Sequence, residues 1–421
     1  ERDYAYAGSF YAFCVWIGLG VLALVESLEK FVKNKTVVAS VVTALCLCVP
    51  ALMAAENWDD HDRSNRTACR DFGSNYLMSC PKNAIIFTNG DNDTFPLWYN
   101  QEVEGNRTDI RVCNLSYLQG SWYIDQMKRQ AYESEPLPIS WDHSQYRTGM
   151  LDMARTYDHP TIKRLDLKQS LDFVRNEKYI GEDGVGVIPV KQLYLPIDSV
   201  QVVQTGTVAE EFADSIVPEI IIPLKGGLSK ADLMVLEMMQ TNEWKRPIYF
   251  AVTVGEQFYP DVNKYFQLEG LAYRLVPVEA NEPPRVNTNV MFDNMMNKFR
   301  WGGVNNPQTY IDETVLRLCR THRLMFAYLS DALIKEGKNE MAKQALDRCM
   351  EVLPTSTVLI DYSCILLAKN YYKLNEQEKA NGNLPKTKNG NDITFATWLK
   401  QQGLTNKAME GIVTAPDTIA V

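Results

Sequence analysis

Two long stretches without charge stand near the N-terminal end of the chain, whereas the remainder mixes polar and apolar positions. Ser9 to Val25 has no charged residue, and neither has Val37 to Ala55. Each is close to the roughly 20 residues that span the hydrocarbon core of a bilayer. We therefore predict two transmembrane helices, over about residues 9–26 and 37–55 of a segment 1–56. A buried helical hairpin in a soluble core is the alternative, but the lysine-bearing loop between the stretches favours the membrane.

The loop between the two stretches indicates their orientation. It carries Lys30, Lys33 and Lys35, which the positive-inside rule places in the cytoplasm, so both outer flanks are expected on the other side. Positive charges on those flanks, Arg2 among them, weaken this argument. Because the sequence begins at Glu1 rather than at a methionine, we expect it to be the C-terminal portion of a longer polypeptide.

A charge-rich strip, Glu56 to Arg63, follows the second stretch where it would leave the bilayer. Trp58 suits an interfacial anchor. Arg63 can bind the phosphate of a lipid, and the carboxylates, with Asp60 and His61, can bind a divalent cation. A solvated linker fits the same residues equally well.

The most regular α/β pattern comes next. Ala84 to Thr88 is a short apolar run typical of a strand, Phe95 to Glu102 has helical spacing, and Asp109 to Leu115 predicts a second strand. Thr94 is expected to cap the helix, with Pro96 in its first turn. The arrangement predicts a parallel β-α-β unit within an α/β domain that covers residues 57–285.

In parallel sheets, ligands bind beyond the carboxyl ends of the strands, which is where the loop after Thr88 would lie. Asp91 and Asp93 offer hard oxygen ligands, and Thr94 with nearby amides can hold a phosphate or a sugar hydroxyl. In the alternative interpretation, these side chains only cap the loop and the helix. The predicted ligand- or acceptor-binding residues are Asn89, Asp91, Asn92, Asp93, Thr94, Trp98 and Glu102.

The second half of the α/β domain has its own signals. Ser229 with Asp232 resembles a capping box at the start of a helix that runs to Gln240. Leu271 to Val278 is expected to close the sheet as an edge strand, because Pro277 cannot donate a ladder hydrogen bond. Further strands are predicted at Val200 to Thr207, Glu219 to Pro223 and Pro247 to Val254.

Residues 286–380 are expected to be helical. His322 to Pro354 fits the 34-residue tetratricopeptide pattern, with Ser330 at the small crossing position and Gly337 at the turn. A second, partial repeat follows and is recognised at Cys364. Because such a pair cannot bury its faces alone, it must pack on the α/β domain or on further helices. Residues 381–421 are expected to form a flexible tail.

Charge and motifs narrow the possible chemistry. The chain has 43 Lys plus Arg against 52 Asp plus Glu, and this net charge of −9 argues against nucleic-acid binding. The sequence contains no C-x-x-C, H-E-x-x-H or G-x-S-x-G motif, so no zinc, redox or hydrolase site is predicted from motifs. Cys69 and Cys80 lie in a polar stretch outside the membrane, where a disulfide between them would form if that side is oxidising.

Three segments together carry a family resemblance: Glu1 to Phe10 (ERDYAYAGSF), Phe87 to Tyr99 (FTNGDNDTFPLWY) and Gln101 to Gly105 (QEVEG). They resemble a family of large bacterial multi-pass membrane proteins. That family is catalogued mainly as a domain of unknown function and is related to protein O-mannosyltransferases, with a eukaryotic transmembrane relative. The resemblance extends through about Ala380.

The resemblance implies a glycosyltransferase of the GT-C type. Such an enzyme takes a sugar from a polyprenyl-phosphate donor and passes it to Ser or Thr of a protein outside the cytoplasm, here at a bacterial inner membrane with the soluble domain in the periplasm. The acidic catalytic residue of these enzymes lies in an N-terminal extracytoplasmic loop that no part of this chain matches, so the catalytic residues stay unknown. The soluble part would then handle the acceptor or a partner protein. The residues expected to face the donor phosphate or the membrane lipid are Arg2, Asp3, Asp60, His61 and Arg63.

Two other classes of function stay open. A membrane-anchored, non-enzymatic scaffold would use the repeat helices to recruit periplasmic partners. A metal-dependent sugar or nucleotide hydrolase would centre on Asp91 and Asp93, and it would lose activity on substitution of Asp93 by Asn.

Overall fold

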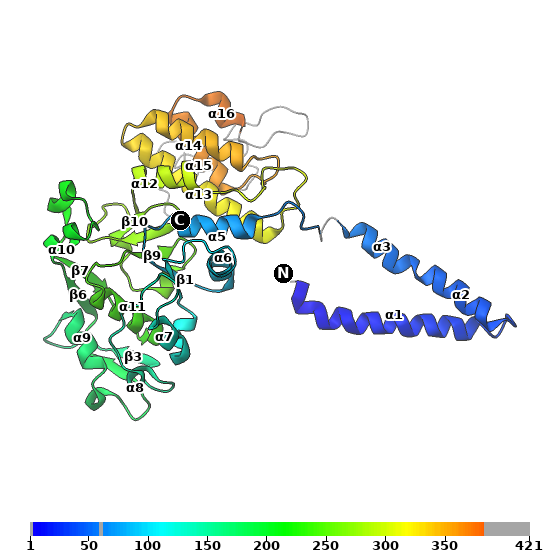
Figure 1. Ribbon diagram of the computed structural model, residues 1–421, viewed down its shortest axis with the longest axis horizontal. Coiled ribbons are helices and arrows are strands. Elements are labelled where there is room, and N and C mark those ends of the chain that lie inside the picture. Colours follow the sequence, from blue (N-terminus) through cyan, green and yellow to red (C-terminus); the bar gives the residue numbers. More distant parts are fainter. Residues whose placement is uncertain (1–2, 59–61, 383–421) are drawn as a thin grey trace. The chain divides into compact units, whose positions relative to one another are not determined.

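The computed structural model describes residues 3–58 and 62–382 of the chain, and it divides into two units, Glu1–Ser64 and Asn65–Val421. Each unit is described by itself. Figure 1 shows the first as a long helical hairpin and the second as an α/β domain with a helical region at one end.

The first unit contains two apolar helical spans, residues 7–28 and 35–56, each long and apolar enough to cross a membrane. The second span is interrupted near Leu47, because the ring of Pro50 removes an amide donor and crowds the carbonyl of Cys46. Nearly all their side chains are exposed, as expected of helices whose solvent is lipid. The prediction that these two segments are helical is confirmed. Their bounds are η1 Asp3–Tyr6, α1 Ala7–Leu28, α2 Lys35–Cys46 and α3 Cys48–Glu56.

A six-stranded mixed sheet with the order β12-β10-β11-β9-β1-β2 is the centre of the second unit. β9, β1 and β2 are parallel to one another, and β11 runs antiparallel beside β9. The strands are β1 Ile85–Thr88, β2 Arg111–Asn114, β9 Ile248–Ala251, β10 Phe266–Leu268, β11 Ala272–Leu275 and β12 Arg285–Val286. The parallel β-α-β unit predicted from the sequence is thereby confirmed.

Two smaller three-stranded sheets and several short helices complete this α/β domain. The strands are β3 Met153–Thr156, β5 Gly186–Ile188 and β8 Leu228–Ser229 in one sheet, and β4 Leu165–Asp166, β6 Gln192–Pro196 and β7 Glu219–Pro223 in the other. The helices are α5 Ala68–Met78, α6 Asp91–Glu102, α7 Ser121–Met127, α8 His143–Tyr146, α9 Leu167–Val174, α10 Ser199–Gln204, α11 Lys230–Thr241 and α12 Thr288–Asp293. The short 3-10 helices are η2 Tyr117–Gln119, η3 Glu177–Tyr179, η4 Glu210–Ser215, η5 Glu256–Phe258 and η6 Asn263–Tyr265, and η7 Asn294–Lys298 is a π-helix.

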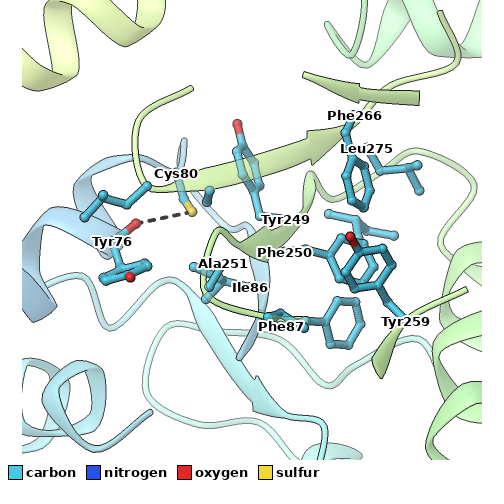
Figure 2. Packing of buried hydrophobic residues seen from close by; sticks show 14 of the residues in the cluster. Tyr76, Cys80, Ile86, Phe87, Tyr249, Phe250, Ala251, Tyr259, Phe266 and Leu275 are labelled. Atoms are coloured by element: carbon cyan, nitrogen blue, oxygen red, sulfur yellow. Dashed lines mark hydrogen bonds between the residues drawn. The ribbon is translucent and has the colours of Figure 1, made fainter. Parts of the chain in front are cut away.

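The core of the sheet is aromatic and aliphatic. Figure 2 shows the rings of Phe87, Phe250 and Phe266 side by side, with centroids 4.9 Å apart for Phe87 and Phe250 and 5.2 Å apart for Phe250 and Phe266. These side chains come from β1, β9 and β10, so the rings link strands that are far apart in sequence. Buried aromatic pairs of this kind contribute about 0.5–1.5 kcal/mol beyond the area that they bury.

Two predictions about strands are wrong. Residues 199–204, within the predicted strand Val200 to Thr207, form helix α10, because the Asp198 carboxylate accepts hydrogen bonds from the amides of Val200 and Gln201 and so caps a helix. Strand β11 is not an edge strand, because β10 and β12 extend the sheet beyond it and Pro277 lies past its last residue. The capping box of Ser229 is confirmed at the start of α11.

The C-terminal region of the described chain is helical, as predicted. Gly337, with a φ of +75°, makes the turn between the first two helices, and the Ser330 hydroxyl accepts a hydrogen bond from the Asn370 amide at 2.8 Å. The guanidinium of Arg323, fully buried, donates to the carbonyls of Leu353 and Val358 and so holds the region together. A tetratricopeptide geometry stays a prediction, and the tail 383–421 lies outside the described residues. The helices are α13 Glu313–Lys335, α14 Asn339–Val352, α15 Tyr362–Lys373 and α16 Gln377–Gly382.

Close packing between α5 and α6 requires a glycine at position 73. A Cβ there would lie 2.6 Å from the carbonyl oxygen of Pro96. We expect Gly73→Ala to lower the free energy of unfolding by about 1–3 kcal/mol, although alanine favours helices, because the two helix backbones must separate. Gly226→Ala is the control, since a Cβ at Gly226 meets nothing within 4 Å. Chemical denaturation measures both, and an unchanged or raised stability of Gly73→Ala would contradict this packing.

His322 of α13 is buried in an aromatic box, with its ring centroid 4.3 Å from Phe72 and 5.6 Å from Trp301. Burial lowers the pKa of His322 to about 4, and its Nδ1 donates to the Leu318 carbonyl at 2.7 Å. The unfolded state therefore binds a proton at higher pH than the folded state does. Stability is expected to fall as the pH drops from about 6.5 to 4, by up to roughly 3 kcal/mol.

Denaturation curves across that range of pH measure the loss. His322→Gln is expected to be less stable at pH 7 but to show a flatter dependence on pH. Equal slopes for the two proteins between pH 6.5 and 4 would show that His322 is not the group responsible.

Candidate functional site

Three parallel strands end together at the carboxyl edge of the sheet. Thr88 ends β1, Asn114 ends β2 directly opposite it, and Thr253 follows β9 closely. Helix α6 begins at Asp91, immediately after the tight turn that leaves β1 (Figure 1). The edge at which ligands bind in such sheets therefore carries hydroxyl, amide and carboxylate side chains.

A small polar network fixes the turn. The Thr94 hydroxyl donates to the Gly90 carbonyl at 2.7 Å and lies 2.7 Å from the Thr88 hydroxyl. The Asn114 side-chain amide donates to Thr94 Oγ1 at 2.8 Å and to the Gly90 carbonyl at 3.2 Å. Gly90 itself has a φ of +77°, a conformation that few other residues adopt. The turn is thus held in one shape by side chains from both strands.

The network corrects the expected role of Thr94. It is not the N-cap, because the helix starts three residues earlier with Gly90 at the cap position, and Pro96 lies inside the helix rather than in its first turn. Its hydroxyl instead donates to the carbonyl of Gly90, in the turn that follows β1. Asn114, which completes the network, was missed by sequence reasoning. Its place at the end of the second strand is the signal that could have found it.

Asp93 is the most unusual carboxylate of the site. Its residue is 9 % exposed, and burial raises its pKa, while a hydrogen bond with Thr253 opposes the shift. The Tyr76 hydroxyl lies 3.5 Å from the Thr253 hydroxyl and so extends the chain of polar groups. A partly buried carboxylate in this position can accept a hydrogen bond from a ligand hydroxyl, and it takes up a proton more readily than an exposed Asp does.

The two acidic residues of the turn face different ways. Asp91 is exposed and Asp93 is buried, since positions two apart on a helix point about 200° from each other. Within the described residues, no group of three or more His, Cys, Asp or Glu side chains is placed to hold a metal ion. Asp91 and Asp93 are therefore not placed to share one cation.

A row of aromatic side chains, here called the aromatic strip, lies beside the turn and comprises Phe95, Trp98, Tyr117 and Trp122. Successive ring centroids are 5.5, 6.1 and 6.0 Å apart. Phe95 is 47 % exposed and Trp122 is 60 % exposed, so both ends of the strip face solvent. The strip is joined to the turn because the hydroxyl of Ser116 donates to Asn89 Oδ1 at 2.7 Å.

The structure brings most of the predicted binding residues together. Those from Asn89 to Trp98 share the turn and the first two turns of α6. Glu102 does not join them, because it ends α6 roughly 16 Å along the helix from Asp91 and there accepts a hydrogen bond from the Tyr132 hydroxyl. Phe95, Tyr117 and Trp122 were not predicted as site residues. The first has the helical spacing from Trp98 that could have indicated it.

The residues expected at the donor phosphate belong to the first unit. Arg2, Asp60 and His61 lie outside the described residues. Asp3 lies in η1, and one guanidinium nitrogen of Arg63 donates to the Asp62 carbonyl at 3.3 Å. Their part in phosphate or lipid binding stays a prediction.

The predicted disulfide is wrong, because both thiols are free and Cys69 is exposed whereas Cys80 is buried. Helix α5 and its last turn separate the two residues by roughly 16 Å, while a disulfide requires Cα atoms about 4.4–6.8 Å apart. The Cys80 thiol instead donates to the Tyr76 carbonyl, as Figure 2 shows, and burial raises its pKa. Polar residues around Cys69 concealed that this stretch is a helix.

These features place the candidate site in a mixed α/β domain of a chain that also carries two apolar, membrane-length helices. Residues 69–294 match the model of the TMEM260-associated domain 2. The match covers more than half of the chain, so the chain belongs to this family, a membrane protein family of unknown function. The matched segment contains the whole six-stranded sheet, the turn and the aromatic strip. Searches of curated proteins and of solved structures find no match.

The raised pKa of Asp93 has a consequence for stability. An acid that binds its proton more tightly in the folded than in the unfolded state weakens folding at neutral pH, and this loss disappears as the pH falls through the raised pKa. We expect Asp93→Asn to be more stable than the wild type at pH 7, with the difference shrinking as the solution is acidified. Thermal unfolding of both proteins from pH 7 to 4 measures it. A wild type that is the more stable at pH 7 would contradict the assignment.

Proposed function

We propose that the α/β domain binds the acceptor protein for a membrane glycosyltransferase through sugars that this protein already carries, at the turn and the aromatic strip. The observation that carries the proposal is the aromatic strip, whose ends are exposed, beside the exposed side chains of Asp91 and Asn92. The C–H groups of a sugar ring carry partial positive charge and pack on the negative face of an aromatic ring. Its hydroxyls meanwhile require hydrogen-bond partners, which the neighbouring turn offers.

In this proposal the full protein transfers a sugar from a polyprenyl-phosphate donor to Ser or Thr of an extracytoplasmic protein. The class of reaction rests on the resemblance of the segments Glu1 to Phe10 and Phe87 to Tyr99 to relatives of protein O-mannosyltransferases. The two apolar spans support placement at a membrane. A bacterial inner membrane, with the soluble domain in the periplasm, belongs to the same proposal.

The electrostatics of the turn support acceptor binding rather than cleavage of the donor. Inverting transfer needs a carboxylate to deprotonate the acceptor hydroxyl and a cation to stabilise the leaving phosphate. In the described part of the chain, no cationic group contributes to the shifted pKa of Asp93; burial and Thr253 account for it. The carboxylates of the turn would therefore repel a phosphate dianion. The hydroxyl groups of an uncharged sugar or of a Ser side chain could instead donate hydrogen bonds to them.

The helices α13 to α15 support the second candidate, a scaffold for partner proteins. Helix α13 packs against both α14 and α15, and Gly337 makes the turn between α13 and α14, an arrangement consistent with the tetratricopeptide pattern of the sequence. A scaffold would need no sugar at the strip. Binding of a glycan at the strip therefore separates the two functions.

The strip gives the direct test. Trp98 lies at its centre between Phe95 and Tyr117, so Trp98→Ala is expected to weaken binding of a mannosylated Ser/Thr peptide at least tenfold. Isothermal titration of the full chain in detergent measures the affinity. In the complete enzyme, the same change should raise the KM for the acceptor far more than it lowers kcat.

Tyr157→Ala is the matched control, because Tyr157 is an aromatic residue that is 50 % exposed and lies outside the strip. It is expected to bind the peptide as the wild type does. If the wild type shows no affinity for the mannosylated peptide or for its unmodified form, acceptor binding is excluded and the scaffold is favoured.

A further inference from the structure

A cavity of about 460 Å³ lies at the opposite edge of the sheet from the aromatic strip. Its walls come from the loop that leads to η4, from β10 to β12, and from the turn between α13 and α14. This volume is within the range of roughly 300–1,000 Å³ that small-molecule sites occupy. From the groups that line it we infer that the cavity is a binding site for an organic phosphate.

Arg274 is the first cation of the cavity, and its hydrogen-bond donors are not all used. The Arg274 side chain is 14 % exposed, and its Nε is buried without a hydrogen-bond partner. Its other nitrogens are held loosely, one donating to the Gly206 carbonyl at 3.3 Å and one lying 3.9 Å from Glu269. A guanidinium has five donors in a planar fork, and leaving one of them unpaired inside a protein is costly. The guanidinium nitrogen that contacts Gly206, which also lines the cavity, has a second hydrogen that it would donate to an anion there.

Two more cations line the same cavity. Arg285, on β12, has no ion-pair partner among the described residues, and its guanidinium lies 5.8 Å from the centre of the Phe212 ring. Lys338, in the turn after α13, donates to Thr288 Oγ1 and to Asn289 Oδ1, each at 3.0 Å. The three cations reach the cavity from separate segments, so the fold rather than local sequence gathers them.

The carboxylates nearby are already engaged. Glu336 is the one acidic residue of the lining, and it accepts from the Thr288 hydroxyl and pairs with Lys338, both at 2.7 Å. Glu269 lies behind the wall, where it accepts from the Tyr249 hydroxyl and from Gln267. The lining therefore has three cations against one carboxylate. Glu269 offsets part of the charge of Arg274 from 3.9 Å, and the positive charge that remains matches a phosphate monoester, which has more negative charge and more acceptor oxygens than a carboxylate.

Part of the lining is apolar, which indicates that the phosphate belongs to an organic molecule. Val208, Val276 and Val278 form a small cluster separate from the main core, and all three line the cavity. The ring of Phe212 adds an aromatic surface beside Arg285. The Phe212 ring is 47 % exposed, so a bare phosphate ion would leave it uncovered, whereas the organic part of a phosphate ester would bury it.

Isothermal titration of the full chain in detergent with phenyl phosphate tests the inference. We expect saturable binding of one molecule per chain, weakened at least tenfold by Arg285→Gln. Benzoate should bind at least tenfold more weakly than phenyl phosphate, because it carries one negative charge. Arg155→Gln is the control, since Arg155 is 57 % exposed and lies outside the cavity, and it should bind as the wild type does.

A second variant tests the apolar part of the lining separately from the cations. Phe212→Ala should weaken phenyl phosphate and leave the affinity for inorganic phosphate unchanged, and it keeps the test decisive if Arg285→Gln fails to fold. No binding of phenyl phosphate, or equal affinities for wild type and Arg285→Gln, would overturn the inference. Dihexanoyl phosphatidate identifies the source of the phosphate: tighter binding than phenyl phosphate supports a lipid headgroup, and weaker binding supports a small free phosphate.

Discussion

The parallel pairing of β1 with β2 and β9 sets the geometry on which the candidate site depends. It places Thr88 opposite Asn114 and brings Thr253 to the same edge, so that polar side chains from three distant parts of the sequence lie at one edge of the sheet. Thr94 then joins the strand ends to the start of α6 through hydrogen bonds of 2.7 and 2.8 Å. Because these bonds use side chains from both strands, the turn cannot shift without breaking the sheet edge.

The same constraint positions the groups that can meet a ligand. Fixing the start of α6 buries Asp93 on one face and leaves Asp91 and Phe95 exposed on others. The next turn of α6 carries Trp98, which stacks on Tyr117 from the segment after β2, so the strip is assembled from two elements that the strand pairing aligns. At the far edge of the sheet, β10 to β12 bring Arg274 and Arg285 to a cavity of opposite electrostatic character. One sheet therefore offers an acidic, aromatic surface and a basic cavity, and the two do not compete for the same ligand.

The sequence predicted the elements whose signals are local. The apolar run ending at Thr88, the capping box of Ser229 and the uncharged spans were sufficient for their strands and helices. Prediction from the sequence failed where the local structure depends on a residue that is distant in the sequence or on a single capping side chain. The β-branched residues after Asp198 indicated a strand, but one carboxylate cap made them a helix. Asn114 and Tyr117 joined the site only through strand pairing, and the helix that separates Cys69 from Cys80 was concealed by its polar composition.

The turn and the aromatic strip are proposed to form one surface that binds a sugar-bearing acceptor. Hydrogen exchange of the full chain, with and without a mannosylated Ser/Thr peptide, tests it most directly because it needs no substitution. We expect the amides of residues 89–98 and 114–122 to exchange more slowly on addition of the peptide, with no change around Arg285. Protection that appears only among the helices α13 to α16, or none at all, would contradict it.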